Sequence, residues 1–141
     1  MTTTQLLLLP AFAHVALVLV IAARMGRGRV QAVRGGRVKL SDVENDPAKW
    51  PERERKLARN YANQFELPVL FYAALALQLV TGLADGVAIA LSWAFVLARI
   101  IHSCIHIGAN VVIQRFYAFL AGFSCIALMW VWFALRLYVI G

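Results

Sequence analysis

The chain has 141 residues, of which 62% are hydrophobic and 15% are charged, so it forms one domain at most. Ordinary soluble proteins are about 45–50% apolar, and a chain this short needs a mostly polar surface to remain in water. The same composition excludes intrinsic disorder. These proportions therefore predict an integral membrane protein.

The basic residues are concentrated in one part of the chain. The formal net charge is +7, and apart from Arg99, Arg115 and Arg136 every basic residue lies between Arg24 and Arg59. One charged segment in an apolar chain is typical of the cytoplasmic side of a membrane protein. No basic patch with interleaved aromatic residues is present, so the sequence indicates no nucleic-acid partner.

The hydropathy pattern predicts an all-α protein with four helices in a single domain. The predicted helices cover about residues 5–24, 51–83, 87–107 and 115–138. The segment over about residues 25–50 is polar and rich in glycine, which predicts a long loop. One long and two short connections describe an antiparallel four-helix bundle. Because the long loop is basic, we expect it in the cytoplasm and both termini on the other side of the membrane.

Polar side chains inside the second and third predicted helices form one stripe on each helix. The stripes consist of Arg59, Asn63 and Glu66 on the second helix and of Arg99, His102, His106 and Asn110 on the third. Residues three, four or seven positions apart share a helical face. A charged side chain near the bilayer centre costs at least about 2.5–3.5 kcal/mol, so the stripes are expected to face each other, another subunit or a wet cavity. Pro68 is expected to bend the second helix.

These residues allow more than one interpretation. In the first, the groups neutralise one another, with Glu66 paired to Arg99 and the amides and imidazoles hydrogen-bonded across the bundle. In the second, the three arginines Arg59, Arg99 and Arg115 outnumber the single carboxylate, and the excess charge binds an anionic ligand. The two third-helix histidines also have a metal- or haem-ligand spacing, but no third ligand is in register and we predict no metal site.

The segment Arg59–Pro68 resembles the signature of the MAPEG superfamily, the membrane-associated proteins of eicosanoid and glutathione metabolism. That signature is an arginine, then an asparagine, a glutamate and a nearby proline at the same spacings. The stretch from Arg99 to His102, followed by His106 and Arg115, resembles the family's third-helix pattern and the arginine that opens its fourth helix. The resemblance covers nearly the whole chain and implies a homotrimer of four-helix subunits.

The resemblance also implies a function. Glutathione would bind between neighbouring subunits near the cytosolic side, as a co-substrate. Arg115 would be the catalytic residue that stabilises its thiolate, which attacks a hydrophobic small molecule arriving from the membrane lipid. The residues implied to bind glutathione are Arg59, Asn63, Glu66, Arg99, His102 and His106. The expected protein is a membrane-bound glutathione-dependent transferase or peroxidase in a bacterial inner membrane, with both termini periplasmic.

Three positions depart from the catalytic eicosanoid-type pattern. Ala62 stands where those members have arginine, and His106 and Phe119 stand where they have tyrosine. These changes remove hydrogen-bond donors to the ligand. The family also includes a non-catalytic lipid-binding member, so the alternative is a non-catalytic protein that binds lipid or another anion. A structural, transport or metal-binding bundle is the third interpretation.

Overall fold

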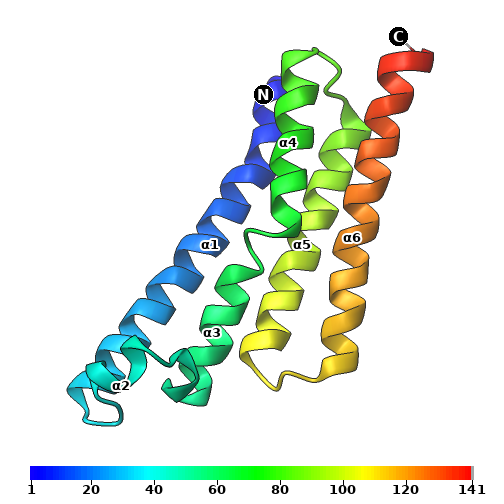
Figure 1. Ribbon diagram of the computed structural model, residues 1–141. Coiled ribbons are helices and arrows are strands. Elements are labelled where there is room, and N and C mark those ends of the chain that lie inside the picture. The colour runs from blue at the N-terminus through cyan, green and yellow to red at the C-terminus, as the bar shows by residue number, and fades with distance from the viewer. Residues whose placement is uncertain (141) are drawn as a thin grey trace.

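The computed structural model describes residues 1–140, and every regular element among them is helical. In chain order the elements are α1 (Thr3–Arg34), α2 (Leu40–Glu44), η1 (Pro47–Lys49), α3 (Glu52–Ala62), α4 (Leu67–Val80), α5 (Gly86–Ile107), α6 (Val112–Leu135) and η2 (Arg136–Ile140). The long helices run side by side, and the two ends of the chain lie at the same end of the bundle (Figure 1). The prediction of an all-α fold is confirmed for the described residues.

Three helical segments are long and apolar enough to cross a membrane, namely Thr3–Arg34, Gly86–Ile107 and Val112–Ile140. The remaining predicted span is divided, because α3 ends at Ala62 and α4 begins at Leu67. The two pieces follow each other along one column of the bundle (Figure 1). With 14 residues, α4 is shorter than the roughly 20 residues that a single membrane helix needs.

The first part of the predicted loop over about 25–50 is helix instead, because α1 continues through it. Gly26 and Gly28 do not break this helix. Gly28 packs against α3, where an added Cβ would lie 3.1 Å from Oε1 of Glu54, so glycine lets the two helices approach closely. The loop begins only after α1 ends, where Gly36 has a φ of 67°.

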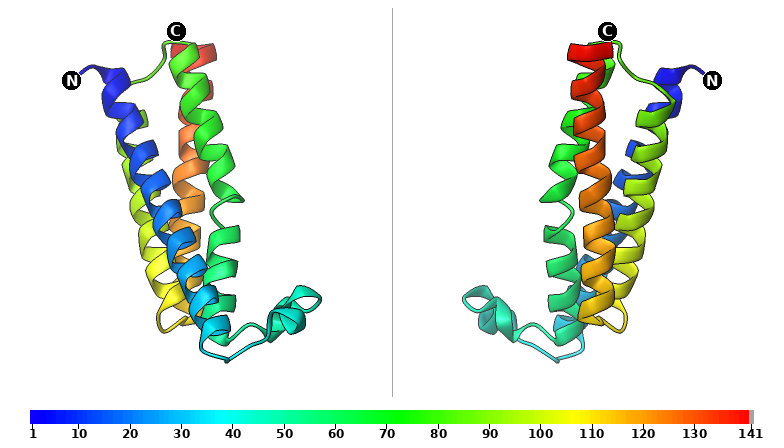
Figure 2. Two further views of the ribbon diagram at one scale, coloured as in Figure 1. Left: turned by 90° about the vertical axis from the view of Figure 1, so that its left-hand side faces the viewer. Right: turned by 90° about the vertical axis from the view of Figure 1, so that its right-hand side faces the viewer.

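The rest of that segment turns away from the bundle. α2 and η1 project to one side at the end opposite the termini, as both views in Figure 2 show. A small apolar cluster of Ala32, Val38 and Val43, with Trp50 packed against it, holds this projection to α1. The guanidinium of Arg29 lies 5.1 Å from the centroid of the Trp50 ring. Local packing therefore orders part of the segment that was predicted as a long loop.

The main core lies among α1, α4, α5 and α6. Phe71 and Phe95 stack at its centre with ring centroids 4.7 Å apart. Buried His14 of α1 joins them, with Nδ1 2.8 Å from the hydroxyl of Tyr72. Trp130 of α6 donates from Nε1 to the main-chain oxygen of Leu70 at 3.2 Å and so ties α6 to α4.

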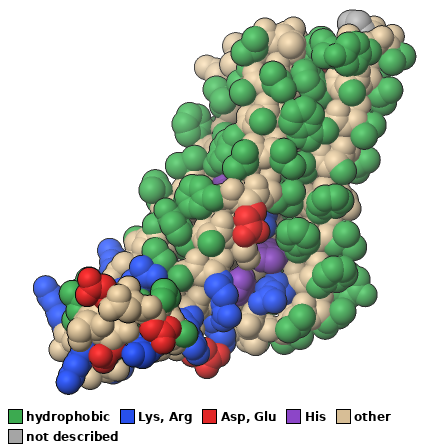
Figure 3. Space-filling model, viewed as in Figure 1, with side chains coloured by type: hydrophobic (Ala, Val, Ile, Leu, Met, Phe, Trp, Pro, Cys, Tyr) green, Lys and Arg blue, Asp and Glu red, His purple; other side chains and the backbone are tan. Residues whose placement is uncertain are grey.

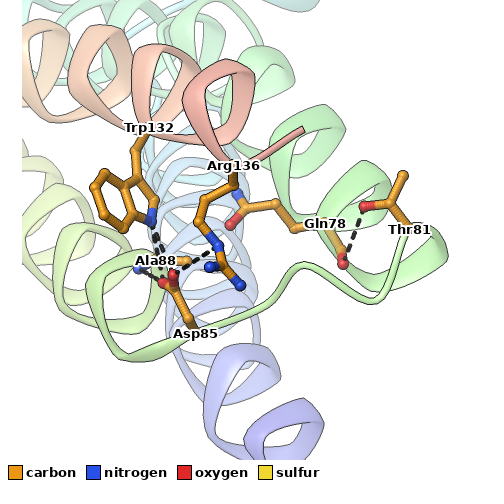
Figure 4. A network of polar contacts seen from close by, with 6 residues as sticks. All are labelled: Gln78, Thr81, Asp85, Ala88, Trp132 and Arg136. Carbon is orange, nitrogen blue, oxygen red and sulfur yellow. Dashed lines mark hydrogen bonds and ion pairs between the residues drawn. The ribbon is translucent and has the colours of Figure 1, made fainter. Parts of the chain in front are cut away.

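A polar contact fastens α5 to α6 at the end that carries the termini (Figure 4). The carboxylate of Asp85 accepts a hydrogen bond from the main-chain amide of Ala88 at 2.9 Å, which caps the first turn of α5. It also accepts one from Nε1 of Trp132 at 3.0 Å and pairs with Nε of Arg136 at 3.4 Å. This cluster fixes the short turn before α5 against the end of α6, far from the polar stripes.

Candidate functional site

The polar stripes line one cavity of about 690 Å³ toward the end opposite the termini. The cavity lies between the α3–α4 break, the second half of α5 and the start of α6. Figure 3 shows arginine and histidine side chains gathered in this hollow among apolar surfaces. Its lining residues are Arg59, Ala62, Asn63, Glu66, Leu67, Arg99, His102, His106, Asn110, Val112, Arg115, Phe116 and Phe119.

Every residue that the sequence analysis selected for a ligand site lines this cavity. These residues are Arg59, Asn63, Glu66, Arg99, His102, His106 and Arg115. They come from α3, the break, α5 and α6, so the two predicted stripes do converge. Their roles in binding and catalysis remain predictions.

The break between α3 and α4 places two of these residues at the cavity wall. Pro68 lies in the first turn of α4, where its missing N–H and its ring are tolerated, whereas the same residue inside a continuous helix would displace the preceding turn. Asn63 follows the end of α3 and Glu66 precedes the start of α4. The bend expected at Pro68 is therefore a full interruption of the helix.

Arg99 of α5 reaches across to this break. Its side chain is only 1% exposed, and its Nη2 donates to the main-chain oxygen of Asn63 at 2.8 Å and to Oε1 of Gln64 at 3.1 Å. Glu66 forms no ion pair with any residue in the described range 1–140. The pairing of Glu66 with Arg99 that the first interpretation expected is thus absent there. Nη2 of Arg99 bonds neutral oxygen acceptors instead, and its Nε is buried without a hydrogen-bond partner.

A buried polar network lies behind Arg99, between α3 and α5. The Nε2 atom of Gln64 donates to the main-chain oxygen of Asn60 at 3.0 Å and to Oγ of Ser103 at 3.2 Å. Ser103 in turn donates to Oδ1 of Asn60 at 3.2 Å. The sequence analysis missed these residues, although Asn60 and Gln64 are four positions apart and share a second polar face of the helix.

The turn between α5 and α6 fixes Arg115. Its Nη1 donates to Oδ1 of Asn110 at 2.7 Å, and its main-chain oxygen lies 3.2 Å from Nδ1 of His102. Asn110 has a φ of 54°, a left-handed conformation that asparagine adopts more readily than most residues. The charged head of Arg115 is therefore held by the turn, and its main-chain oxygen is held by His102 of α5.

The two histidines present free nitrogen atoms beside the cavity. Nε2 of His102 and both ring nitrogens of His106 are buried and have no hydrogen-bond partner. The two rings lie 5.7 Å apart, centroid to centroid. Among residues 1–140, no group of three or more His, Cys, Asp or Glu side chains could hold a metal ion. Unpaired polar atoms inside a protein call for an unseen partner, such as a ligand, water or a second chain.

The cavity is lined by positively charged side chains on one side and by apolar side chains on the other. Arg59, Arg99 and Arg115 line it together with the single carboxylate of Glu66. On the α6 side, its lining includes apolar side chains that are well exposed on one chain, namely Val112 at 66%, Phe116 at 54% and Phe119 at 40%. Such a site suits an anion that carries, or lies beside, an apolar group.

Comparison with known proteins identifies the family of this chain. The family model described as the MAPEG family matches residues 7–135. That match includes the α3–α4 break and every residue that lines the cavity. No curated protein and no solved structure matches the chain at a significant level.

Proposed function

The chain belongs to the MAPEG family and is a membrane protein, and from this we propose that it is a glutathione-dependent transferase or peroxidase acting on hydrophobic electrophiles. The observation that carries the proposal is the cavity in which three arginines face one carboxylate beside an apolar wall. Glutathione has two carboxylates and one amino group, so its charges complement this lining.

The residues of the cavity divide naturally among the groups of glutathione. Arg59 is exposed, and among residues 1–140 it forms no ion pair, so its guanidinium is free to bind a carboxylate. Glu66 is also exposed on one chain and is the matching group for the amino nitrogen. Asn63 lies between them on the same wall and can serve as donor or acceptor.

Arg115 is the residue that we assign to the chemistry. Bound glutathione would supply the thiol, whose sulfur is nucleophilic only as the thiolate. An ordinary cysteine thiol has a pKa of about 8.5, which an adjacent cation lowers. Asn110 and His102 hold Arg115 in one place, so its charge needs little rearrangement to stabilise the thiolate. Phe116 and Phe119 provide the apolar side from which a hydrophobic electrophile would approach from the lipid.

We further propose that the working form is a homotrimer, in which a neighbouring subunit covers the open side of the cavity. The family resemblance motivates this, and the exposed apolar side chains of α6 around the opening are compatible with it. We place the basic end in the cytoplasm and the termini, which share the opposite end (Figure 1), in the periplasm of a bacterial inner membrane.

One observation favours a second candidate, a non-catalytic protein that binds lipid or another anion. Ala62, His106 and Phe119 are the positions that depart from the catalytic pattern, and all three line the cavity. The guanidinium donors at position 62 and the hydroxyl donor at position 119 are therefore missing from the site itself, whereas His106 retains a ring N–H. A lipid with an anionic headgroup would use the same arginines and the same apolar wall.

The test uses the purified protein in detergent micelles. Glutathione is added, the ultraviolet absorbance of its thiolate is recorded, and conjugation of a chlorodinitrobenzene is followed. A thiolate signal with conjugation supports the transferase. Retention of lipid in native mass spectrometry, with no thiolate signal and no conjugation, supports the second candidate and contradicts the first.

A further inference from the structure

We infer that Arg99 is a positioning residue, which holds the break between α3 and α4 and thereby sets where Asn63 and Glu66 stand in the cavity. The effect on glutathione binding rests on the proposed function, whereas the contacts between Arg99 and the break do not depend on any ligand. In this role Arg99 differs from Arg59 and Arg115, which we assign to direct contact with the ligand.

The break leaves main-chain carbonyl groups without their usual helical partners. The main-chain amide of Gln64 donates to the carbonyl of Tyr61 at 3.0 Å and not to that of Asn60, as it would in an α-helix. The carbonyl of Asn60 accepts a hydrogen bond from Nε2 of the Gln64 side chain instead, also at 3.0 Å. The carbonyl of Asn63 accepts from Arg99 at 2.8 Å. The side chains of Arg99 and Gln64 therefore replace the missing amides, as an interrupted helix in a membrane protein requires.

Arg99 is anchored so that one of its donor atoms, Nη2, bonds the break. A single atom, Nη2, bonds both the Asn63 carbonyl and Oε1 of Gln64, and Gln64 is itself held by Asn60 and Ser103. Only 1% of the Arg99 side chain is exposed. In contrast, Arg59 is exposed and Arg115 is half-buried, as expected of groups that meet a ligand.

The break decides how Asn63 and Glu66 are placed on the cavity wall. Each residue in an α-helix advances the side-chain direction by about 100°, so a continuous helix would keep Glu66 within about 20° of the face that Arg59 occupies. At the break Glu66 instead has a non-helical φ of −91° and ψ of −95°, which changes where its carboxylate lies on that wall. Arg99 favours the interrupted form, because there its Nη2 supplies a donor to an Asn63 carbonyl that accepts no main-chain amide.

The test compares Arg99→Met, Arg99→Lys and, as a matched control, Ser92→Ala. Ser92 is buried on α5 seven positions earlier and bonds only the main-chain oxygen of Ala88 within its own helix. Amide hydrogen exchange over residues 63–69 and the Kd for glutathione are measured for each protein in detergent. In Arg99→Met we expect exchange and Kd each to rise about tenfold, the effect of losing a charge-assisted hydrogen bond.

Arg99→Lys is expected to stay within about threefold of the wild type in both measurements, because one ammonium can donate to both oxygen acceptors. Ser92→Ala should match the wild type. If Arg99→Met does not fold, Gln64→Met is used instead, because it removes the side-chain oxygen that Arg99 bonds. We expect it also to raise the exchange rate over the break and the Kd for glutathione. Unchanged exchange over the break in whichever variant folds would overturn the inference.

A double substitution separates positioning from direct contact. If Arg99 acts by placing Glu66, then adding Arg99→Met to a Glu66→Gln protein should raise Kd less than about twofold, because the two changes share one effect. A full further tenfold rise would mean that Arg99 binds the ligand itself, which overturns the inference. If the wild type binds no glutathione but Arg99→Met still speeds exchange over the break, the positioning role stands and the proposed function fails.

Discussion

The Nδ1 atom of His102 lies 3.2 Å from the main-chain carbonyl oxygen of Arg115 and so joins α5 to the first turn of α6. A carbonyl oxygen only accepts hydrogen bonds, so Nδ1 carries the proton. The head of the same arginine is held by Asn110 at 2.7 Å. Arg115 is thus fixed at two points before any ligand arrives, which is the arrangement that charge stabilisation in catalysis requires.

Replacement of Arg115 by alanine is expected to abolish the thiolate absorbance of added glutathione and to slow conjugation at least about 100-fold, as the loss of one pre-organised donor usually does. Arg136→Ala is the matched control, because Arg136 pairs with Asp85 at the other end of the bundle. We expect that control to conjugate like the wild type. Equal conjugation rates in Arg115→Ala and the wild type would show that the assigned role is wrong.

Substitutions at Asn110 separate the side chain from the backbone conformation. Glycine and alanine both remove the contact with Arg115, so each variant should lose about tenfold in conjugation rate. Only alanine is strained at a φ of 54°, so Asn110→Ala should be less stable than Asn110→Gly by about 1 kcal/mol. Thermal unfolding in detergent measures the difference. Full activity in Asn110→Gly would contradict a role for this contact.

Glu66→Ala is expected to weaken glutathione binding about tenfold, because a carboxylate bound to an ammonium group is lost. The oligomeric state should not change. Glu52→Ala is the control, since Glu52 is exposed and pairs only with Lys56 on α3 at 2.9 Å. Calorimetric titration and light scattering on the same samples measure affinity and mass. Unaltered affinity in Glu66→Ala would remove Glu66 from the site.

Asp85 is expected to matter for stability and not for binding. Asp85→Ala loses the helix cap, the bond from Trp132 and the pairing with Arg136, which together should cost about 2–3 kcal/mol. Asp85→Asn retains a capping oxygen and should lose less. Thermal unfolding followed by tryptophan fluorescence tests the order of stability. A change in glutathione affinity would show that the two ends of the bundle are coupled.

Much of the fold follows from short-range patterns in the sequence. Apolar runs predicted the three membrane-capable helices. Of these, α5 extends from Gly86 to Ile107, within one residue of its predicted start, because Asp85 supplies a cap and Gly108 ends the helix. The course of α1 through Gly26 and Gly28 was not predicted. At Gly28, contact with α3 offsets the low helix propensity of glycine, and such contact leaves no local signature.

The candidate site was predictable where the charges are unusual. Arginine, glutamate and histidine inside apolar helices are conspicuous, and helical periodicity alone groups them on one face. The amide and hydroxyl side chains that hold these groups were less evident, because neutral polar residues occur in many settings. Gln64 and Ser103 come within hydrogen-bond distance only when α3 and α5 lie side by side in the folded bundle. For the same reason the sequence predicted a bend near Pro68 but not the interruption that Arg99 supports.

The shortness of α4 bears on how the chain is built into the bilayer. Its 14 residues make a helix about 21 Å long, against a hydrocarbon thickness of about 30 Å. As it emerges from the ribosome, such a segment gains too little from the lipid to be retained firmly by itself. Its bond from Trp130 comes from α6, which is synthesised after it. We therefore expect α4 to reach its final position only after α6 has been translated. Truncation before α6 should leave α4 accessible to reagents that label cysteines placed in it.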